Sequence, residues 1–317
     1  GIVLTLLGLR NQEVTFQIAM FMVLIGAEFF LPMRALGSAF HVAMNGATAG
    51  KKVITMLKEE CMENGTEKMD TISEIQLENV SYHYPDAKEN ILQNINMVLK
   101  KGFTSLIGDS GCGKSTLSKI LTRQLEGYEG KIRIDAKELS SLDIADYRKH
   151  VCYLSNDTFL LHLSIRDGFR FYHPELDEKT MLALLEEVSL KDRVMDAGGL
   201  DYVPQEGAND LSGGEKQRLV LSYYLSTKRD FYVFDETTSN IDKESEEIIL
   251  DKIHELSKNC IVLFISHRLH NALKADYVYY FDKEQGKLLS GTVDELLKTC
   301  SPFMQNMENE RRWEEIL

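Results

Sequence analysis

The chain has 317 residues, of which 44% are hydrophobic, and a formal net charge of −13. This length allows about two domains and at least one large buried core. The acidic balance argues against a nucleic-acid partner, because binding to a phosphate backbone depends on clustered Lys and Arg side chains. The five cysteines are widely spaced without a Cys-x-x-Cys pair. They indicate neither a zinc site nor a disulfide framework, and they suit a reducing cytosol.

The N-terminal part predicts a membrane-spanning helix. The apolar run over residues 14–31 is interrupted only by Thr15, Gln17, Gly26 and Glu28. As a helix it would reach roughly 27 Å, close to the hydrocarbon thickness of a bilayer. We therefore expect a span over residues 14–34. The alternative is a buried helix of a soluble protein, which Glu28 favours because a carboxylate in lipid is costly.

Basic residues predict the orientation of this span. Arg34, His41, Lys51 and Lys52 follow it, so the positive-inside rule puts its C-terminal end in the cytoplasm and residues 10–13 outside. Residues 1–9 are too few to cross a bilayer and are expected to end a preceding span, joined by a short turn over residues 8–14. Because the chain begins with Gly1, we expect a C-terminal fragment: residues 1–70 from a helical transmembrane domain and residues 71–317 as a second domain.

Two strands are expected after the break at Asn64-Gly65-Thr66. Residues 74–84 alternate between apolar and polar side chains, Pro85 ends this segment, and residues 91–99 form the next strand-like segment. Tyr84 lies beside the turn, where its ring can stack on an adenine. The alternative is an ordinary half-buried strand tyrosine.

Residues 108–116 read Gly-Asp-Ser-Gly-Cys-Gly-Lys-Ser-Thr and fit the phosphate-binding pattern Gly-x4-Gly-Lys-Ser/Thr. An apolar strand over residues 103–107 precedes this loop, and a helix-compatible run over residues 116–124 follows it. Glycines let consecutive N–H groups point at phosphate oxygens, and the helix adds the positive end of its dipole. Lys114 supplies a mobile positive charge. The loop predicts ATP as the ligand.

The next motif, Leu211-Ser212-Gly213-Gly214-Glu215, precedes a predicted helix over residues 217–225. Its serine and glycines fit a helix N-cap, and a capped N-terminus is also an anion site. Because the chain already has a phosphate loop, we expect this second site to close over a nucleotide that another subunit holds.

Two further strands end in polar residues. Asp235 and Glu236 follow the strand over residues 231–234, and His267 follows the strand over residues 260–265, which we expect beside the first. Ser115 and Asp235 are suited to hold Mg²⁺, Glu236 to polarise an attacking water, and His267 to bond the γ-phosphate. The alternative for the two carboxylates is a solvated acidic turn.

Together with Ser239-Asn240-Ile241-Asp242 and Ser266-His267-Arg268, these motifs resemble the nucleotide-binding domain of an ABC transporter over residues 72–300. The resemblance implies an α/β fold of the P-loop NTPase class, with an antiparallel β subdomain and a helical subdomain, preceded by a transmembrane helix. It implies that Glu236 is the catalytic base, with His267 and Lys114 as further catalytic residues, and that Ser115, Asn156 and Asp235 hold the metal. The nucleotide-binding residues that it implies are Tyr84, Gly108, Asp109, Ser110, Gly111, Cys112, Gly113, Lys114, Ser115, Thr116, Asn156, Leu211, Ser212, Gly213, Gly214, Glu215 and Asp242.

One position departs from the family pattern. Asn156 stands where the family usually has a glutamine that touches Mg²⁺ and senses the membrane domain. The amide chemistry is the same on a shorter arm, so we expect the contact to persist and the coupling to change.

The resemblance also implies export, because Glu206 matches the acidic residue of the exporter X-loop. The expected partners are a second half-transporter, identical or different, a lipid membrane and a small-molecule or peptide cargo, without nucleic acid. The expected location is the cytoplasmic membrane, with the ATP-binding domain in the cytoplasm. Residues 28–38 resemble the last span of heterodimeric thiol exporters linked to cytochrome bd assembly, and also that of peptide and lipid exporters.

Two other classes of ABC protein remain as alternatives. A soluble ABC ATPase that acts on ribosomes or DNA usually carries two cassettes or a coiled-coil insertion, and an importer ATPase is normally a separate soluble subunit. The single cassette, the acidic balance and the apolar run over residues 14–31 argue against the soluble ATPase, and the same apolar run argues against the importer ATPase.

Overall fold

The computed structural model describes residues 2–58, 64–85, 87, 89–156, 160–239, 241–282 and 287–316. Its contacts divide the chain into two compact units, Gly1–Met62 and Glu63–Leu317. Each unit is described by itself.

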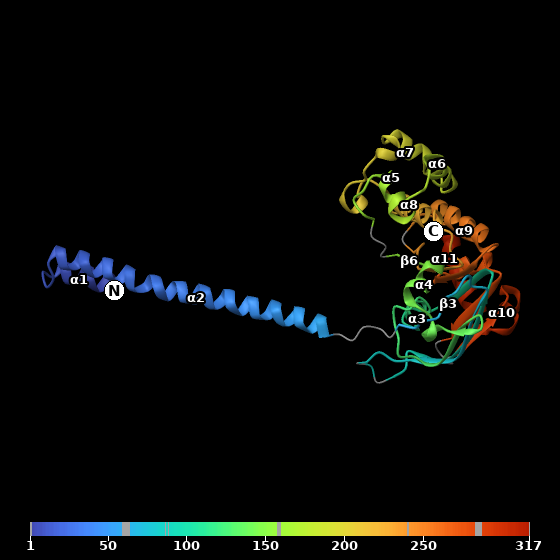
Figure 1. The fold of residues 1–317 in the computed structure, drawn as a ribbon, viewed down its shortest axis with the longest axis horizontal. Coiled ribbons are helices and arrows are strands. Elements are labelled where there is room, and N and C mark those ends of the chain that lie inside the picture. The colour runs from blue at the N-terminus through green and yellow to red at the C-terminus, as the bar shows by residue number, and fades with distance from the viewer. Residues whose placement is uncertain are drawn as a thin grey trace. The chain divides into compact units, whose positions relative to one another are not determined.

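The first unit is a helical hairpin. Helix α1 (Ile2–Arg10) folds back beside helix α2 (Phe16–Lys58), as Figure 1 shows. The backbone N–H groups of Glu13 and Val14 both donate to the carbonyl of Gly8, which closes the expected turn. A Cβ on Gly8 would lie 2.9 Å from Cγ2 of Val14, so the turn packs too tightly there for a side chain.

Helix α2 is continuous and much longer than the expected span over residues 14–34. It passes through Pro32 without ending and continues to Lys58, so the predicted extension beyond the apolar run is part of the same helix. Among the described residues, α2 is the one helix that is long and apolar enough to cross a membrane, and most of its large apolar side chains are exposed. Its spanning role stays a prediction.

The second unit contains two sheets. The four-stranded antiparallel sheet has the order β2-β1-β4-β5, and alternate residues of its strands are buried, as the alternating sequence pattern predicts. Its strands are β1 (Glu74–Tyr82), β2 (Leu92–Lys100), β4 (Glu129–Ile134) and β5 (Lys137–Glu138). This sheet confirms the expected antiparallel β subdomain.

The six-stranded sheet has the order β10-β9-β3-β8-β7-β6 within the described residues. Strands β9, β3, β8, β7 and β6 are mutually parallel, and only β10 pairs antiparallel at the edge. The central strands are continuous apolar runs because both faces are covered. The strands are β3 (Gly102–Gly108), β6 (Val151–Ser155), β7 (Phe231–Asp235), β8 (Ile261–Ser266), β9 (Tyr277–Asp282) and β10 (Lys287–Gly291).

Helices surround this sheet and also form a separate lobe. Figure 1 shows α5, α6, α7 and α8 gathered together in that lobe, which confirms the expected helical subdomain. The lobe helices are α5 (Ile165–Tyr172), α6 (Glu178–Glu187), α7 (Lys191–Asp196) and α8 (Gly213–Leu225). The other helices are α3 (Lys114–Leu121), α4 (Ile144–His150), α9 (Lys243–Ser257), α10 (Val293–Thr299) and α11 (Ser301–Ile316). Short 3-10 helices are η1 (Leu139–Ser141), η2 (Gly199–Asp201), η3 (Glu206–Ala208) and η4 (Leu269–Lys274).

Two large apolar clusters cover the two faces of the six-stranded sheet. Side chains that alternate along β7 and β8 divide between them: Phe264 packs with the helical lobe, whereas Leu263 packs with α3 and the antiparallel sheet. A smaller cluster around Phe303 packs the C-terminal helices against β9. The sheet is thereby held rigidly from both sides, and the ends of its strands are free to carry a site.

Candidate functional site

The carboxyl ends of four neighbouring parallel strands bring the predicted site residues together. Strand β8 lies between β3 and β7, and β6 lies on the far side of β7. Ile107 therefore pairs with Ser266, and Asp235 pairs with both Ile265 and Ser155. Segments that are far apart in sequence thus leave the sheet side by side, which is where open α/β sheets place ligand sites.

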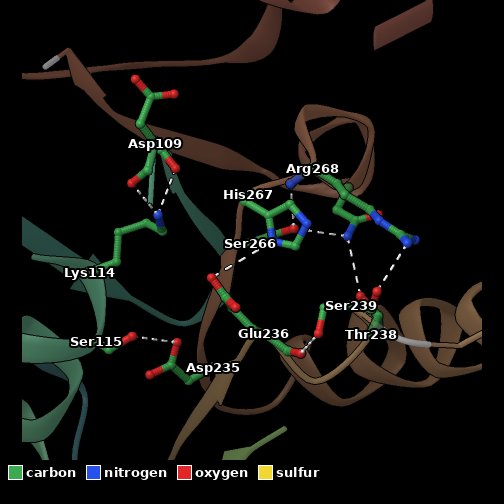
Figure 2. A network of polar contacts seen from close by, with 12 residues as sticks. Asp109, Lys114, Ser115, Asp235, Glu236, Thr238, Ser239, Ser266, His267 and Arg268 are labelled. Atoms are coloured by element: carbon green, nitrogen blue, oxygen red, sulfur yellow. Dashed lines mark hydrogen bonds and ion pairs between the residues drawn. The ribbon is translucent and has the colours of Figure 1, made fainter. Parts of the chain in front are cut away.

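The phosphate loop connects β3 to α3. Lys114 is 4% exposed, and its Nζ donates to the carbonyls of Gly108 at 2.6 Å and Asp109 at 2.9 Å, so the loop curls around the ammonium group (Figure 2). Gly113 has a φ of 101°, and a Cβ there would lie 2.7 Å from Leu92 Cδ2, so only glycine fits this position. Burial raises the pKa of the Cys112 thiol, which keeps this loop cysteine protonated at neutral pH.

Asp235 ends β7 as a buried carboxylate beside the start of α3. Its Oδ1 accepts a hydrogen bond from Ser115 Oγ at 3.2 Å, so the two residues of the predicted metal pair lie in contact (Figure 2). Its Oδ2 accepts from Ser118 Oγ at 3.1 Å and from the Tyr153 hydroxyl at 3.0 Å. Ser118 and Tyr153 are not among the predicted site residues. Ser118 lies one helical turn after Ser115 and was detectable from that spacing, whereas Tyr153 reaches Asp235 only through the pairing of β6 with β7.

Asn156 follows β6 and lies next to the same carboxylate strand. Its backbone N–H donates to the carbonyl of Asp235 at 3.2 Å, and its side-chain Oδ1 accepts from Gln217 Nε2 at 3.3 Å. Gln217 belongs to α8. Asn156 is therefore held between β7, which ends in Asp235, and the helical lobe. No local pattern around Asn156 or Gln217 predicts this contact.

Glu236 and His267 approach each other at the ends of β7 and β8. His267 Nδ1 lies 3.7 Å from Glu236 Oε1, and both side chains are partly exposed (Figure 2). Glu236 has a φ of 53°, in the left-handed region that non-glycine residues rarely adopt. Its N–H donates to the carbonyl of Ile265, and its own carbonyl accepts from the N–H and the hydroxyl of Ser239. Local strain held in place by such bonds is typical of functional positions.

Tyr84 lies outside β1, which ends at Tyr82 rather than at the expected residue 84. Its hydroxyl is 3.2 Å from Thr116 Oγ1, and its ring packs edge-on against Tyr82. The ring is therefore next to the first turn of α3 and partly exposed. This position is compatible with stacking on a base.

The Leu211–Glu215 motif, here called the signature loop (residues 211–215), caps α8. Ser212 is the N-cap: its Oγ accepts from the N–H of Glu215, and Glu215 Oε2 accepts from the N–H of Ser212. Among the described residues, no hydrogen bond or ion pair joins the signature loop to residues 108–116.

The signature loop instead packs on the start of α9. A Cβ on Gly214 would lie 2.3 Å from Ser245 Oγ and 2.8 Å from Asp242 Oδ2. Asp242 is the N-cap of α9 and accepts from the N–H of Ser245, which lowers the pKa of the Asp242 carboxyl. Asn240, the second residue of the Ser239-Asn240-Ile241-Asp242 motif, lies outside the described residues.

The residues present fit a nucleotide with Mg²⁺. Within the described part of the chain, no group of three or more His, Cys, Asp and Glu side chains is placed to hold a metal ion. The candidate ligands are a hydroxyl, a carboxylate and an amide, from Ser115, Asp235 and Asn156. Mg²⁺ prefers such oxygen ligands and keeps positions for water and phosphate oxygens. Lys114 and the loop around it supply the donors for phosphate.

Residues 92–239 match a protein-family model that is described as "ABC transporter". An uncharacterized ABC transporter ATP-binding protein of Haemophilus influenzae is 34% identical over 322 aligned residues, covering 100% of this chain and 57% of that protein. An ATP-dependent lipid A-core flippase of Photobacterium profundum is 31% identical over 90% of this chain and 50% of its own length. The chain thus spans about half the length of these two relatives.

Solved structures agree on the fold. A bacterial Atm1-family ABC exporter with ATP bound superposes with a TM-score of 0.75 at 22% identity, over 90% of this chain and 50% of that one. Among relatives in sequence, the fungal ABC multidrug transporter MDR2 of Trichophyton equinum is 32% identical over 76% of this chain and 19% of its own length. With its two sheets, its helical lobe and the match over residues 92–239, the chain described here belongs to the ABC transporter family.

Proposed function

We propose that this chain is the ATP-binding and ATP-hydrolysing part of an ABC exporter. The observation that carries the proposal is the convergence of Lys114, Ser115, Asp235, Glu236 and His267 at the ends of three adjacent strands. A phosphate loop alone would serve nucleotide binding. Glu236 has a strained backbone conformation and lies next to Asp235 and beside His267. Together these side chains add the groups that hydrolysis needs.

In this proposal each group has a separate role. Lys114 and the loop N–H groups hold the β- and γ-phosphates, and Tyr84 stacks on the adenine. Mg²⁺, held by Ser115, Asp235 and Asn156, neutralises charge on the phosphates. Glu236 orients and polarises the attacking water, and His267 donates to the γ-phosphate.

The proposed active unit contains two such domains. The signature loop is capped and offers the N-terminus of α8 as an anion site. Among the described residues it makes no hydrogen bond or ion pair with the phosphate loop of its own chain. It is therefore available for nucleotide bound to a partner. ATP shared in this way favours the closed pair by differential affinity, and hydrolysis lets it reopen.

Export is the direction that we propose, with the chain anchored in the cytoplasmic membrane by α2 and the ATP-binding unit in the cytoplasm. Two observations support this proposal. Helix α2 is long and apolar enough to cross a membrane, and two of the relatives are named as a multidrug transporter and a lipid A-core flippase. The cargo of this chain is proposed only as a small molecule or peptide. The thiol-exporter subtype suggested by residues 28–38 is not confirmed, and the soluble ABC ATPase is not favoured.

The role of Glu236 is tested with Glu236→Gln in the membrane-embedded full-length protein. Because the amide keeps the shape but cannot polarise water, ATP binding is expected to stay within about twofold, while turnover falls by about a hundredfold or more. ATP should also trap a two-chain complex in this variant, measured by light scattering. Glu255→Gln, an exposed carboxylate on α9, is the matched control. Normal turnover in Glu236→Gln would contradict the assigned role, and full turnover by solitary chains would contradict the paired mechanism.

A further inference from the structure

Next to the candidate site lies a polar cluster that the proposed mechanism does not use. We call it the Glu246 network, and Figure 2 shows most of its members. It consists of Thr238, Ser239, Glu246, Ser266, Arg268 and Asn271. These residues come from the loop after β7, from α9, from the end of β8 and from η4.

Glu246 is the centre of this network. It is only 6% exposed, and a carboxylate at such a depth requires compensation for lost hydration. Its Oε2 accepts from Arg268 Nη1 at 2.7 Å, and its Oε1 accepts from Asn271 Nδ2 at 3.1 Å. Both carboxylate oxygens are therefore satisfied, one of them by a charge-assisted bond.

The network fixes the two neighbours of His267 without using its imidazole. On one side, Ser266 Oγ accepts from the backbone N–H of Arg268 at 2.9 Å and from Asn271 Nδ2 at 3.1 Å. On the other side, the Arg268 side chain is anchored on Glu246. The imidazole of His267 remains partly exposed and faces Glu236.

The same arginine reaches the segment that carries Glu236. Arg268 Nη2 donates to the carbonyl of Ser239 at 3.2 Å. Ser239 in turn donates to the carbonyl of Glu236 through both its N–H and its hydroxyl. A continuous chain of bonds thus runs from Glu246 through Arg268 and Ser239 to the backbone of Glu236.

We infer that Glu246 and Arg268 are positioning residues, which set the place of His267 relative to Glu236 and tie both to the loop that begins at Ser239. The inference rests on the proposed function. Its physical basis is that the planar guanidinium reaches two acceptors at once, whereas the buried carboxylate keeps it from turning away. A shift of this loop, as when a partner contacts it, would then move the histidine as well.

The test uses Glu246→Gln in the membrane-embedded full-length protein. The amide preserves the shape but not the charge that anchors Arg268. We expect kcat for ATP hydrolysis to fall by about tenfold to a hundredfold, because small misplacements of catalytic groups are costly. KM for ATP should stay within about twofold, since the phosphate loop is untouched.

Hydrogen exchange supplies a readout that is independent of activity. Loss of the anchor should speed exchange of the Ser239 and Arg268 amides together. Arg268→Gln should reproduce both effects at a partly exposed position, which keeps the inference testable if Glu246→Gln does not fold. Arg268→Lys should have a higher kcat than Arg268→Gln but a lower one than the wild type. The lysine keeps the positive charge that pairs with Glu246, but it lacks the second guanidinium nitrogen that donates to Ser239.

Asp251→Asn is the matched control. Asp251 and Lys274 form an exposed ion pair between the same two elements, α9 and η4, at a distance from the catalytic groups. This variant should leave kcat and exchange unchanged. Unchanged kcat and exchange in Glu246→Gln would overturn the inference, as would a fall in kcat matched by equal loss of ATP affinity. If Glu236→Gln abolishes turnover while Glu246→Gln leaves both kcat and hydrogen exchange unchanged, the proposed function stands and only this inference falls.

Discussion

At Gly214 the signature loop and α9 are packed so closely that no side chain fits between them. A Cβ there would lie 2.3 Å from Ser245 Oγ and 2.7 Å from Ser245 Cβ. A rotation of the serine hydroxyl relieves the first contact but not the second. The glycine is therefore required for the close approach of the signature loop to α9.

Gly214→Ala is expected to destabilise the protein by about 1–3 kcal/mol, since overpacking outweighs the better helix propensity of alanine. Thermal unfolding measures the loss, and ATP turnover should fall with it because the cap of α8 shifts. Ser245→Gly, which removes the two Ser245 atoms and leaves Asp242 Oδ2 at 2.8 Å, serves as the second variant. The pair Gly214→Ala with Ser245→Gly should recover part of the stability relative to Gly214→Ala. No recovery would show that the clash is not the cause.

Among the helices, α9 depends on a charged N-cap that links its stability to pH. The Ser245 N–H holds the pKa of the Asp242 carboxyl below its ordinary value. The folded state therefore favours the ionised form. The resulting stability is fully present above about pH 4, the value for an unfolded aspartate, and is lost as the pH falls through the lower folded pKa.

Thermal unfolding across pH tests this capping role. The melting temperature of the wild-type protein should be nearly constant from about pH 7 to pH 5 and should fall below about pH 4. Asp242→Asn keeps a capping oxygen but carries no charge, so its melting temperature should fall less steeply on the acid side. Asp251→Asn, on the same helix but away from the cap, should follow the wild type. Equal acid slopes in all three proteins would rule out a charge contribution from Asp242.

At the scale of the whole molecule, the main feature of the first unit is the exposed apolar surface of α2. Phe21, Leu24 and Phe29 are exposed along the first half of the helix, whereas Lys51 and Lys52 lie near its end. In water this surface would be unfavourable, and in a bilayer it is solvated by lipid. The membrane is therefore the environment that we expect for residues 16–34.

An introduced charge tests this expectation. Leu24→Arg should impair insertion, because an arginine at the centre of a span costs about 2.5–3.5 kcal/mol. Met44→Arg, similarly exposed but beyond Arg34, should insert normally. Carbonate-resistant membrane association measures the difference. Identical behaviour of the two variants would mean that Leu24 does not lie at the depth we assign.

The candidate site residues could be selected from the sequence because each motif is local. The glycines of residues 108–116, the cap Ser212 with Glu215, and the apolar strand that ends in Asp235 are encoded by neighbouring residues. The antiparallel sheet, the helical lobe and the position of β8 beside β7 were predicted correctly. Strand ends differed by only a few residues, as at Tyr82, since hydrogen-bond pairing rather than composition decides where a strand stops.

Other features depended on contacts between distant segments, and only the tertiary structure decided them. The hydrogen bonds of Tyr153 to Asp235, of Gln217 to Asn156 and of Arg268 to Glu246 each join residues from different elements. Their formation requires the strand order of the sheet and the docking of α8 and α9, which no local pattern encodes. The left-handed backbone of Glu236 is likewise a product of the bonds around it. Thus the local sequence determined which side chains the candidate site contains, and packing between remote segments determined how these side chains are positioned and oriented.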